Sequence, residues 1–452
     1  MSLNKFLKSL TIILDKQWED FSAKTIERTK WILLDTTVAA WDGMNSIEIV
    51  NYLNNAGSKE KSECYSIPII GTDRYTSPSD SLLIHGASIV SNEIDEGNQF
   101  AKGHPAAHIF APAYLAAIEE NATGKELIRA FILGYEVATR FAYACNMNDD
   151  MHPHGTWGTI GGTVATGLLQ KKSKEDLIES ILLAAALPLA TSWEAAATGK
   201  TVRNLYTGIS SQIAYQVSAL QSSGFESSPH VVEHLWGSLI SNKVDPSLFE
   251  KDLWNPPLID KSFFKYYPSC RFTHSTIDAL YGLLRKAKVD ADKIDKVTVE
   301  TYQLAARLTD PKPKNKLAAK FSIPYLTACI LLDKDLFDSF SIDALTNEEV
   351  LALAERVSLV ESKEMTQALP EERAAKVTIQ LRDGSVYAEE VRDASGSFKE
   401  PLSIRDLTKK YTMILQNKEL VKGLIKSTLL IDEQNDVTVW AEQFRTEERS
   451  FA

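Results

Sequence analysis

Residues Gly158–Leu169 read GTIGGTVATGLL and Ser180–Ser192 read SILLAAALPLATS, and neither stretch contains a charged side chain. A helix without a polar face is buried in the centre of a helical bundle. Small residues in the first stretch, such as Gly161 and Gly162, let neighbouring helices approach closely. The two stretches therefore predict a large helical domain with both segments near its centre.

Amphipathic helical patterns surround these two stretches. Apolar residues recur at helical spacing in Ser22–Ala40, Ser79–Glu93, Gly124–Cys145 and Thr207–Gly224, and polar caps or glycines stand at several of their ends. The tail that begins at Leu402 is helical again and could rejoin this domain.

The pattern changes at the proline-containing loop Asp252–Asp260. Beyond it, Lys296–Tyr302 (KVTVETY) and Ala375–Leu381 (AKVTIQL) alternate apolar and polar residues, which is typical of half-buried strands. The dipeptide Asp383-Gly384 follows the second run and predicts a tight hairpin. We therefore expect a smaller α+β domain in this part of the chain.

Composition limits the classes of function. The 452 residues include 60 acidic and 49 basic side chains, for a net charge of −11. An acidic surface repels phosphate and disfavours nucleic-acid binding, so an anionic substrate would need basic side chains gathered in a local pocket. Met1–Asp15 is too short and too interrupted in its apolar residues for a signal peptide or membrane span. We expect a cytoplasmic protein.

Several cofactor and enzyme classes are disfavoured by missing motifs. The four cysteines are widely spaced without C-x-x-C, which argues against a zinc ribbon or an iron–sulfur cluster. A P-loop, a G-x-G-x-x-G between strand and helix, and G-x-S-x-G are absent as well. His104 and His108, like His230 and His234, share i,i+4 spacing, but neither pair has the glutamate of H-E-x-x-H. We expect no metal.

The first candidate site is the loop IDEGNQFAKGHP at residues 94–105. It contains the carboxylates Asp95 and Glu96 and ends in His104 before a predicted helix start at Pro105. The unpaired N–H groups of a helix N-terminus suit a carboxylate substrate. A capping loop with solvated acids is the alternative interpretation of the same residues.

The second candidate is the segment MHPHGTWGTIGG at residues 151–162, in which His152 and His154 precede a glycine-rich helix. The glycines fit either close ligand approach or helix packing. Packing alone does not account for two histidines in front of the helix, so we favour a functional role.

The third candidate is KYYPSCRFTH at residues 265–274. Lys265, Arg271 and His274 could form an anion clamp, because a guanidinium matches a carboxylate bidentately and an ammonium adds a point charge. A solvated basic face is the alternative, but Tyr-Tyr-Pro-Ser-Cys is too apolar for a fully exposed strip.

These segments, in this order, resemble the MmgE/PrpD family. The resemblance runs through almost the whole chain and rests on the following stretches: LLDTTVAAWDG (33–43), the IDEGNQFAKGHP loop with the helix after it and GYEVATR (134–140), HPHGTWGTIGG (152–162), VRNLYTGISSQIA (202–214), KYYPSCRFTHSTIDA (265–279) and AKFSIPY (319–325).

The resemblance implies a large all-helical domain formed by both chain ends and a smaller α+β lid domain. Together with the boundaries above, it gives residues 1–254 and 400–452 for the helical domain and residues 255–399 for the lid. It also implies a homodimer and a small polycarboxylate substrate bound without metal, cluster or organic cofactor.

By position, the resemblance makes Asp95, His104 and His152 the catalytic candidates. Substrate carboxylates would be bound by Lys265, Arg271 and His274 of the lid and by Arg203, which stands where several family members have lysine. His154 is an additional histidine, counted with the substrate-binding residues and expected behind His152 or facing solvent.

The implied activity is that of a cofactor-free lyase on a small di- or tricarboxylate, such as 2-methylcitrate dehydration or cis-aconitate decarboxylation. Each of these reactions transfers a proton at a carbon next to a carboxylate. The family's D-x-x-D-T pattern is replaced here by Asp95-Glu96-Gly97-Asn98-Gln99. Two alternatives therefore remain: an epimerase or isomerase of an iminodisuccinate-like dicarboxylate, and a non-catalytic protein that binds a metabolite.

Overall fold

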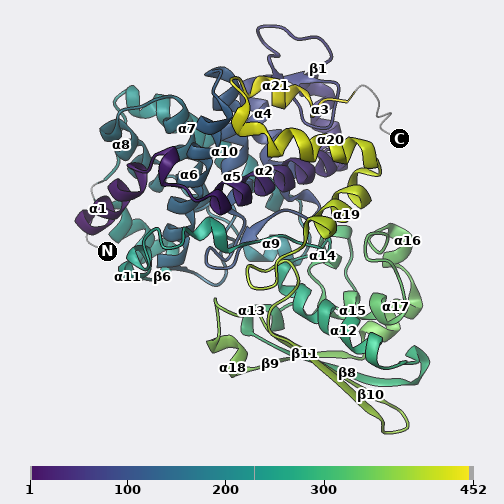
Figure 1. Cartoon of the computed structure of the whole chain (residues 1–452). Helices are drawn as coiled ribbons and strands as arrows, with labels where there is room; N and C mark the ends of the chain where they lie inside the picture. The colour runs from purple at the N-terminus through teal and green to yellow at the C-terminus, as the bar shows by residue number, and fades with distance from the viewer. Residues whose placement is uncertain (1–2, 229, 447–452) are drawn as a thin grey trace. The chain divides into compact units, whose positions relative to one another are not determined.

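The computed structural model describes residues 3–228 and 230–446, and it divides into two compact units (Figure 1). Unit 1 consists of the described residues of Met1–Trp193, Val202–Ser262 and Ile404–Ala452, and unit 2 consists of Glu194–Thr201 and Phe263–Ser403. Helices contain 56% of the residues and strands 10%, which confirms the predicted mainly helical class with a smaller α+β part.

Unit 1 is a bundle of helices from the N-terminal part and the C-terminal part of the chain. In Figure 1 the yellow C-terminal helices lie beside the purple helix α2, and α2 packs against both α19 and α20. The helices are α1 (Leu3–Leu14), α2 (Ala23–Gly43), α3 (Ile47–Ala56), α4 (Pro78–Ser91), α5 (Pro105–Glu119), α6 (Gly124–Ala144), α7 (Gly158–Leu169), α8 (Lys174–Ala185), α10 (Val202–Ser222), the π-helix η2 (Val232–Ile240), α11 (Pro246–Glu250), α19 (Ile404–Leu415), α20 (Lys418–Leu429) and α21 (Thr438–Glu442).

Helix α7 lies at the centre of unit 1, as its charge-free sequence predicts. It packs against α5, α6, α8 and α10, and all its residues except Leu168 are buried. A Cβ atom on Gly161 would lie 2.7 Å from the carbonyl oxygen of Gly134 on α6. The glycine therefore permits the close contact between these two helices.

The second charge-free stretch is only partly buried. Helix α8 ends at Ala185, and Leu187 is exposed, although the apolar pattern predicts a buried helix to Ala190. A proline at position 188 has no N–H and clashes with the carbonyl four residues earlier. The helix consequently stops before Pro188, and the prediction of a buried helix is wrong for the residues after Ala185.

Two small sheets accompany the helices of unit 1. The strands β1 (Gly57–Ser58), β3 (Tyr75–Thr76) and β2 (Ile67–Pro68) form one sheet in that order, and β5 (Cys145–Met147) pairs with β6 (Ser241–Val244). Among the described residues, no helix is both long and apolar enough to cross a membrane.

Unit 2 is built on a four-stranded sheet in the order β11-β10-β8-β9. Strand β10 is antiparallel to β8 and β11, while β8 and β9 are parallel. The strands are β8 (Ile294–Thr301), β9 (Val357–Glu361), β10 (Ala375–Leu381) and β11 (Val386–Val391). Both predicted strand patterns and the hairpin are confirmed, and Gly384 takes the φ of +90° that its turn requires.

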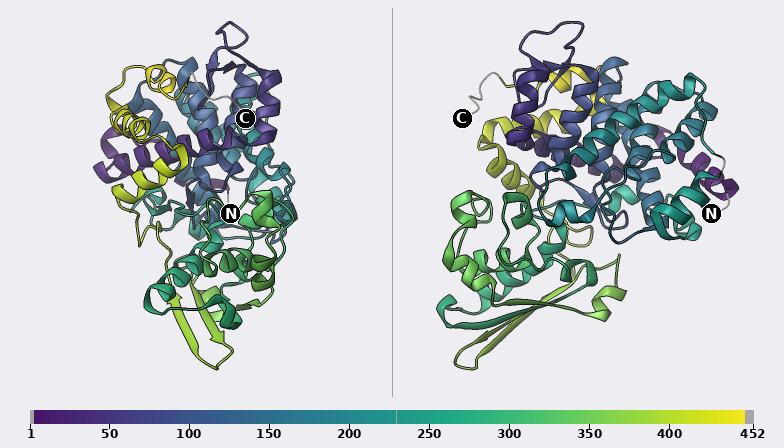
Figure 2. Two further views of the ribbon diagram at one scale, coloured as in Figure 1. Left: turned by 90° about the vertical axis from the view of Figure 1, so that its right-hand side faces the viewer. Right: turned by 180° about the vertical axis from the view of Figure 1, so that it is seen from behind.

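Helices cover one face of this sheet (Figure 2). Helix α12 (His274–Lys286) packs on β10 and β11, and α15 (Ile323–Leu331) packs on α12 and β9. Along β10 buried residues alternate with less buried ones, as the sequence pattern predicts. Short helices, among them α14 (Lys316–Lys320), connect these elements.

Candidate active site

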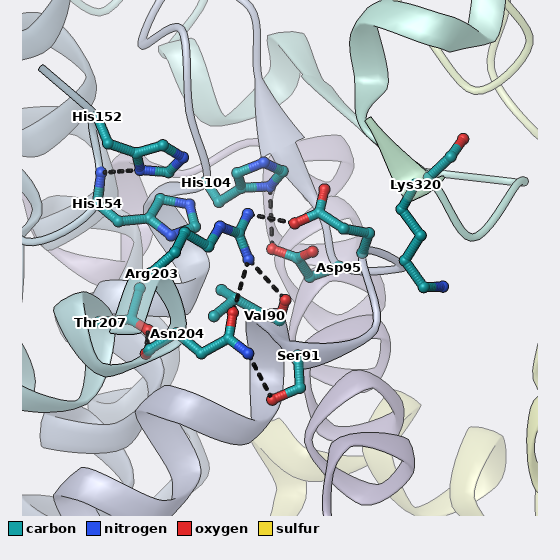
Figure 3. Close-up of polar contacts among 12 residues, drawn as sticks. Val90, Ser91, Asp95, His104, His152, His154, Arg203, Asn204, Thr207 and Lys320 are labelled. Atoms are coloured by element: carbon teal, nitrogen blue, oxygen red, sulfur yellow. Dashed lines mark hydrogen bonds and ion pairs between the residues drawn. The ribbon is translucent and has the colours of Figure 1, made fainter. Parts of the chain in front are cut away.

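The loop between α4 and α5 brings a carboxylate to a histidine. Asp95 is buried, and its Oδ2 lies 3.0 Å from Nδ1 of His104, the residue before the first turn of α5 (Figure 3). The carbonyl oxygen of Glu96 lies 2.6 Å from the same Nδ1. Two acceptors at Nδ1 fix the tautomer in which this nitrogen carries the proton. Nε2 of His104 is then the nitrogen that can accept a proton from a substrate.

Glu96 lies beside this pair, and its carboxyl is buried. Its carboxyl accepts a short hydrogen bond from the Tyr135 hydroxyl and a 3.3 Å bond from the N–H of Ala106. Burial, the largest cause, raises the pKa of Glu96 to about 8. The capping-loop interpretation is right in part, since Glu96 caps α5, but these acids are buried and not solvated. The sequence pattern alone does not distinguish Glu96 from a solvated acid.

The second candidate segment directs His154 into the interior of unit 1. The His154 side chain is fully buried, and its ring meets the rings of His104, His108 and His152 at centroid distances of 5.4, 5.3 and 4.4 Å. The expectation that His154 faces solvent is therefore wrong. The adjacent Gly155 adopts a φ of +79°, and this left-handed turn gives the loop a course that the sequence pattern does not reveal.

His152 is also buried, on the other side of His154. Its Nδ1 accepts a hydrogen bond from the backbone N–H of His154 at 3.2 Å (Figure 3), and its ring stacks on Trp193 at 5.2 Å. Burial, with the nearby Arg203, holds the pKa of His152 well below its usual value. The ring is therefore neutral at physiological pH.

His108 completes this group of four imidazoles, and both of its nitrogens are used within the protein. Nδ1 donates to the carbonyl of His104 at 2.9 Å, and Nε2 accepts from the N–H of Gly155 at 3.1 Å. Burial lowers the pKa of His108 to about 4. We assign His108 a structural part, since it ties α5 to the loop that carries His154.

Arg203 on α10 is buried and forms an ion pair with the buried carboxylate of Glu93. Its Nη1 donates to the carbonyl of Val90 at 2.7 Å and to Oδ1 of Asn204 at 3.2 Å (Figure 3). Nothing local in the sequence signals Glu93 as the partner of Arg203, which lies 110 positions away.

The candidate residues of the third segment lie in unit 2, and all three are buried. Arg271 donates to the carbonyls of Ser395 at 2.9 Å and Ala394 at 3.0 Å, and to Nδ1 of His274 at 3.2 Å. Burial lowers the pKa of Arg271 to about 10. The alternative of a solvated basic face is wrong. Arg271 and His274 are brought together, and Lys265, six positions before Arg271, is also buried.

Unit 2 contains a further buried cation that sequence analysis did not single out. Lys320, the last residue of α14, donates to the carbonyl of Pro268 at 2.9 Å and lies 4.1 Å from the ring centroid of Phe340. The only signal for it was its place in the AKFSIPY stretch. The candidate residues thus form one group in unit 1 and one in unit 2, and the convergence of the two groups stays a prediction.

Among the described residues, no group of three or more His, Cys, Asp or Glu side chains is arranged to hold a metal ion. The absence of a metal stays a prediction, which elemental analysis of the purified protein tests.

Comparisons with known proteins cover both units. The sequence profile of the MmgE/PrpD N-terminal domain matches residues 11–244, and that of the MmgE/PrpD C-terminal domain matches residues 267–419. Among characterised relatives, cis-aconitate decarboxylase of Aspergillus terreus is 24% identical over 93% of this chain and 91% of its own length. Cis-aconitate decarboxylase of Homo sapiens is 25% identical over 92% of this chain and 89% of its own length.

Proposed function

The chain belongs to the MmgE/PrpD family, and from this we propose that it is a cofactor-free lyase that acts on a small di- or tricarboxylate. The reaction begins or ends with proton transfer at a carbon next to a carboxylate. Dehydration of a 2-methylcitrate-like substrate and decarboxylation of a cis-aconitate-like substrate are the two forms of this chemistry. Relatives named as cis-aconitate decarboxylases support the second form.

The observation that carries the proposal is the Asp95–His104 pair. The carboxylate 3.0 Å from Nδ1 orients the ring and stabilises the imidazolium that forms when Nε2 takes a proton. In dehydration, His104 removes the proton from carbon and hydroxide leaves. In decarboxylation, CO₂ leaves first and the protonated His104 returns a proton to the carbon. His152, neutral and buried, is proposed as the second acid/base group.

Both forms pass through an enolate-like species whose charge needs preorganised donors and cations. We propose that Lys265, Arg271, His274 and Arg203 bind the carboxylates of the substrate.

A homodimer in the cytoplasm is part of this proposal. Besides the family resemblance, a row of apolar side chains at i, i+3 and i+7 on α10 supports it: Val202, Leu205 and Ile209 are exposed to 46%, 39% and 37%. Contact with a second copy would cover such a row. Light scattering at micromolar concentration tests the dimer, and a monomeric mass would contradict it.

A second candidate is epimerisation of an iminodisuccinate-like dicarboxylate, with a non-catalytic metabolite-binding protein as the third. The sequence Asp95-Glu96-Gly97-Asn98-Gln99 favours these alternatives, since it lacks the second aspartate and the threonine of the family's lyases. Epimerisation needs acid/base groups on both faces of one carbon, and this site contains several imidazoles.

One experiment separates the three candidates. Purified, metal-depleted protein is incubated with 2-methylcitrate, citrate, cis-aconitate and iminodisuccinate, and products are followed by NMR. We expect loss of water or CO₂ from at least one tricarboxylate. Exchange or inversion at carbon with iminodisuccinate alone would identify an epimerase. Binding without any turnover would indicate the non-catalytic protein.

A further inference from the structure

His154 differs from the other buried imidazoles of unit 1 in its hydrogen bonding. Both of its ring nitrogens are without a hydrogen-bond partner among the residues that the structure describes, and the side chain is fully buried. His108, in contrast, uses both nitrogens, and His152 accepts a hydrogen bond at Nδ1.

This arrangement is unfavourable for the fold alone. A buried polar atom without a partner destabilises a fold, and buried side-chain nitrogens are normally paired. The three imidazoles around His154 contact it edge to face, so they fill space without offering it a hydrogen bond. An aromatic hydrocarbon side chain could make the same ring contacts without this cost.

The chemistry of the ring defines what it can bind. Burial, followed by the nearby Arg203, holds the pKa of His154 well below its usual value, so the ring is neutral. A neutral imidazole has one donor and one acceptor nitrogen. The two nitrogens diverge, so they serve two different partner atoms: an acceptor such as a carboxylate oxygen, and a donor such as a hydroxyl or a bound water.

The position of the ring supports a partner at the reacting centre. Its centroid lies 5.4 Å from that of His104, whose Nδ1 is held by Asp95. A group bound to His154 would thus be adjacent to the proposed base.

We propose that His154 contacts the substrate directly, donating through one ring nitrogen to a substrate oxygen and accepting through the other from a hydroxyl or water. This inference rests on the proposed function and adds His154 to its catalytic residues. The alternative is that the ring only fills the core of unit 1.

The decisive variant is His154→Phe, which keeps an aromatic ring, slightly larger than the imidazole, but removes both nitrogens. Its matched control is His108→Phe, which removes two nitrogens that are bonded to backbone groups. We expect His154→Phe to unfold at the same urea concentration as the wild type or a higher one, and His108→Phe at a lower one. On the substrate that the wild type converts, kcat/KM of His154→Phe should fall by about 10²-fold or more.

Other outcomes overturn the inference. If His154→Phe keeps kcat/KM within about threefold of the wild type, far below the usual effect of an acid/base group, the inference is wrong and the proposed function stands. If its urea midpoint falls as far as that of His108→Phe, the ring supports the fold.

A binding measurement covers the case in which the wild type converts none of the four substrates and the proposed function fails. Saturating tricarballylate is then added, and the urea midpoints are compared. A rise for the wild type but not for His154→Phe supports direct contact between His154 and a polycarboxylate. An equal rise in both proteins, or no rise in the wild type, contradicts it.

Discussion

Lys410 of the C-terminal helix α19 forms an ion pair of 2.5 Å with Asp35 of α2, and both side chains are buried. The same ammonium donates to the carbonyl of Ile94 at 2.8 Å, directly before Asp95. The C-terminal segment therefore supports the loop that carries the proposed catalytic carboxylate. This contact links both ends of the chain to one site in unit 1.

Replacing Lys410 by methionine should destabilise the protein strongly. It leaves the Asp35 carboxylate buried without its cation, and breaking such a pair commonly costs about 3–5 kcal/mol. Urea unfolding at pH 7 measures the loss. The exposed neighbour Lys409 provides the control, since Lys409→Met should change the unfolding free energy by less than about 0.5 kcal/mol. Equal effects of the two variants would contradict a structural role for the pair.

Asp95→Asn should impair catalysis more than it affects stability. The amide keeps the shape of the side chain but loses the charge that stabilises protonated His104, and its NH₂ group can enforce the wrong tautomer. We expect kcat to fall by about 10²-fold or more with a small change in the urea midpoint. The exposed Asp292→Asn is the control, and activity within threefold in both variants would remove Asp95 from the mechanism.

His104→Ala and His152→Ala should both lower kcat by about 10²–10⁴-fold. Both rings are buried and held by neighbours, His104 by Asp95 and His152 by Trp193, so both variants should also lower the urea midpoint. Exposed His234→Ala should change neither property. Wild-type turnover in either site variant would show that the other histidine acts without it.

Much of the fold was predictable because its signals are local. The charge-free sequence of α7 indicates a central helix whatever surrounds it, and the alternation in Ala375–Leu381 indicates a half-buried strand. Glu93 and Arg203 were not recognised as a pair, since their contact depends on the course of the chain just after α4 and on the position of α10 beside it. The buried position of the His154 side chain depends on the left-handed backbone turn at Gly155. The residue types His152 and His154 do not reveal such a turn.

Lys265→Met should weaken substrate binding as well as turnover. A carboxylate bound by an ammonium is held in both the ground state and the transition state, so KM should rise while kcat falls. Steady-state kinetics with the preferred tricarboxylate gives both constants. Exposed Lys288→Met serves as the control. A fall in kcat with KM unchanged would indicate that Lys265 acts only after the substrate is bound.

Glu96→Gln should stabilise the protein in a manner that depends on pH. The pKa of Glu96 is raised from 4.5 to about 8 in the folded protein, so folding takes up a proton between these values. In this range the unfolded state binds fewer protons, and the stability of the wild type falls as pH rises. The glutamine has no such proton to gain, and its amide can still hydrogen-bond Tyr135 and the Ala106 N–H.

The stability advantage of Glu96→Gln should accordingly be smallest near pH 5, increase toward pH 8 and change little above that value. Urea unfolding of both proteins at several pH values measures this difference. Glu136→Gln is not a suitable control, because Glu136 is paired with Arg140. The exposed Glu349→Gln is suitable, and its difference from the wild type should stay flat with pH. A flat profile for Glu96→Gln as well would mean that Glu96 is ionised in the folded protein throughout, and would remove it as a proton-bearing neighbour of His104.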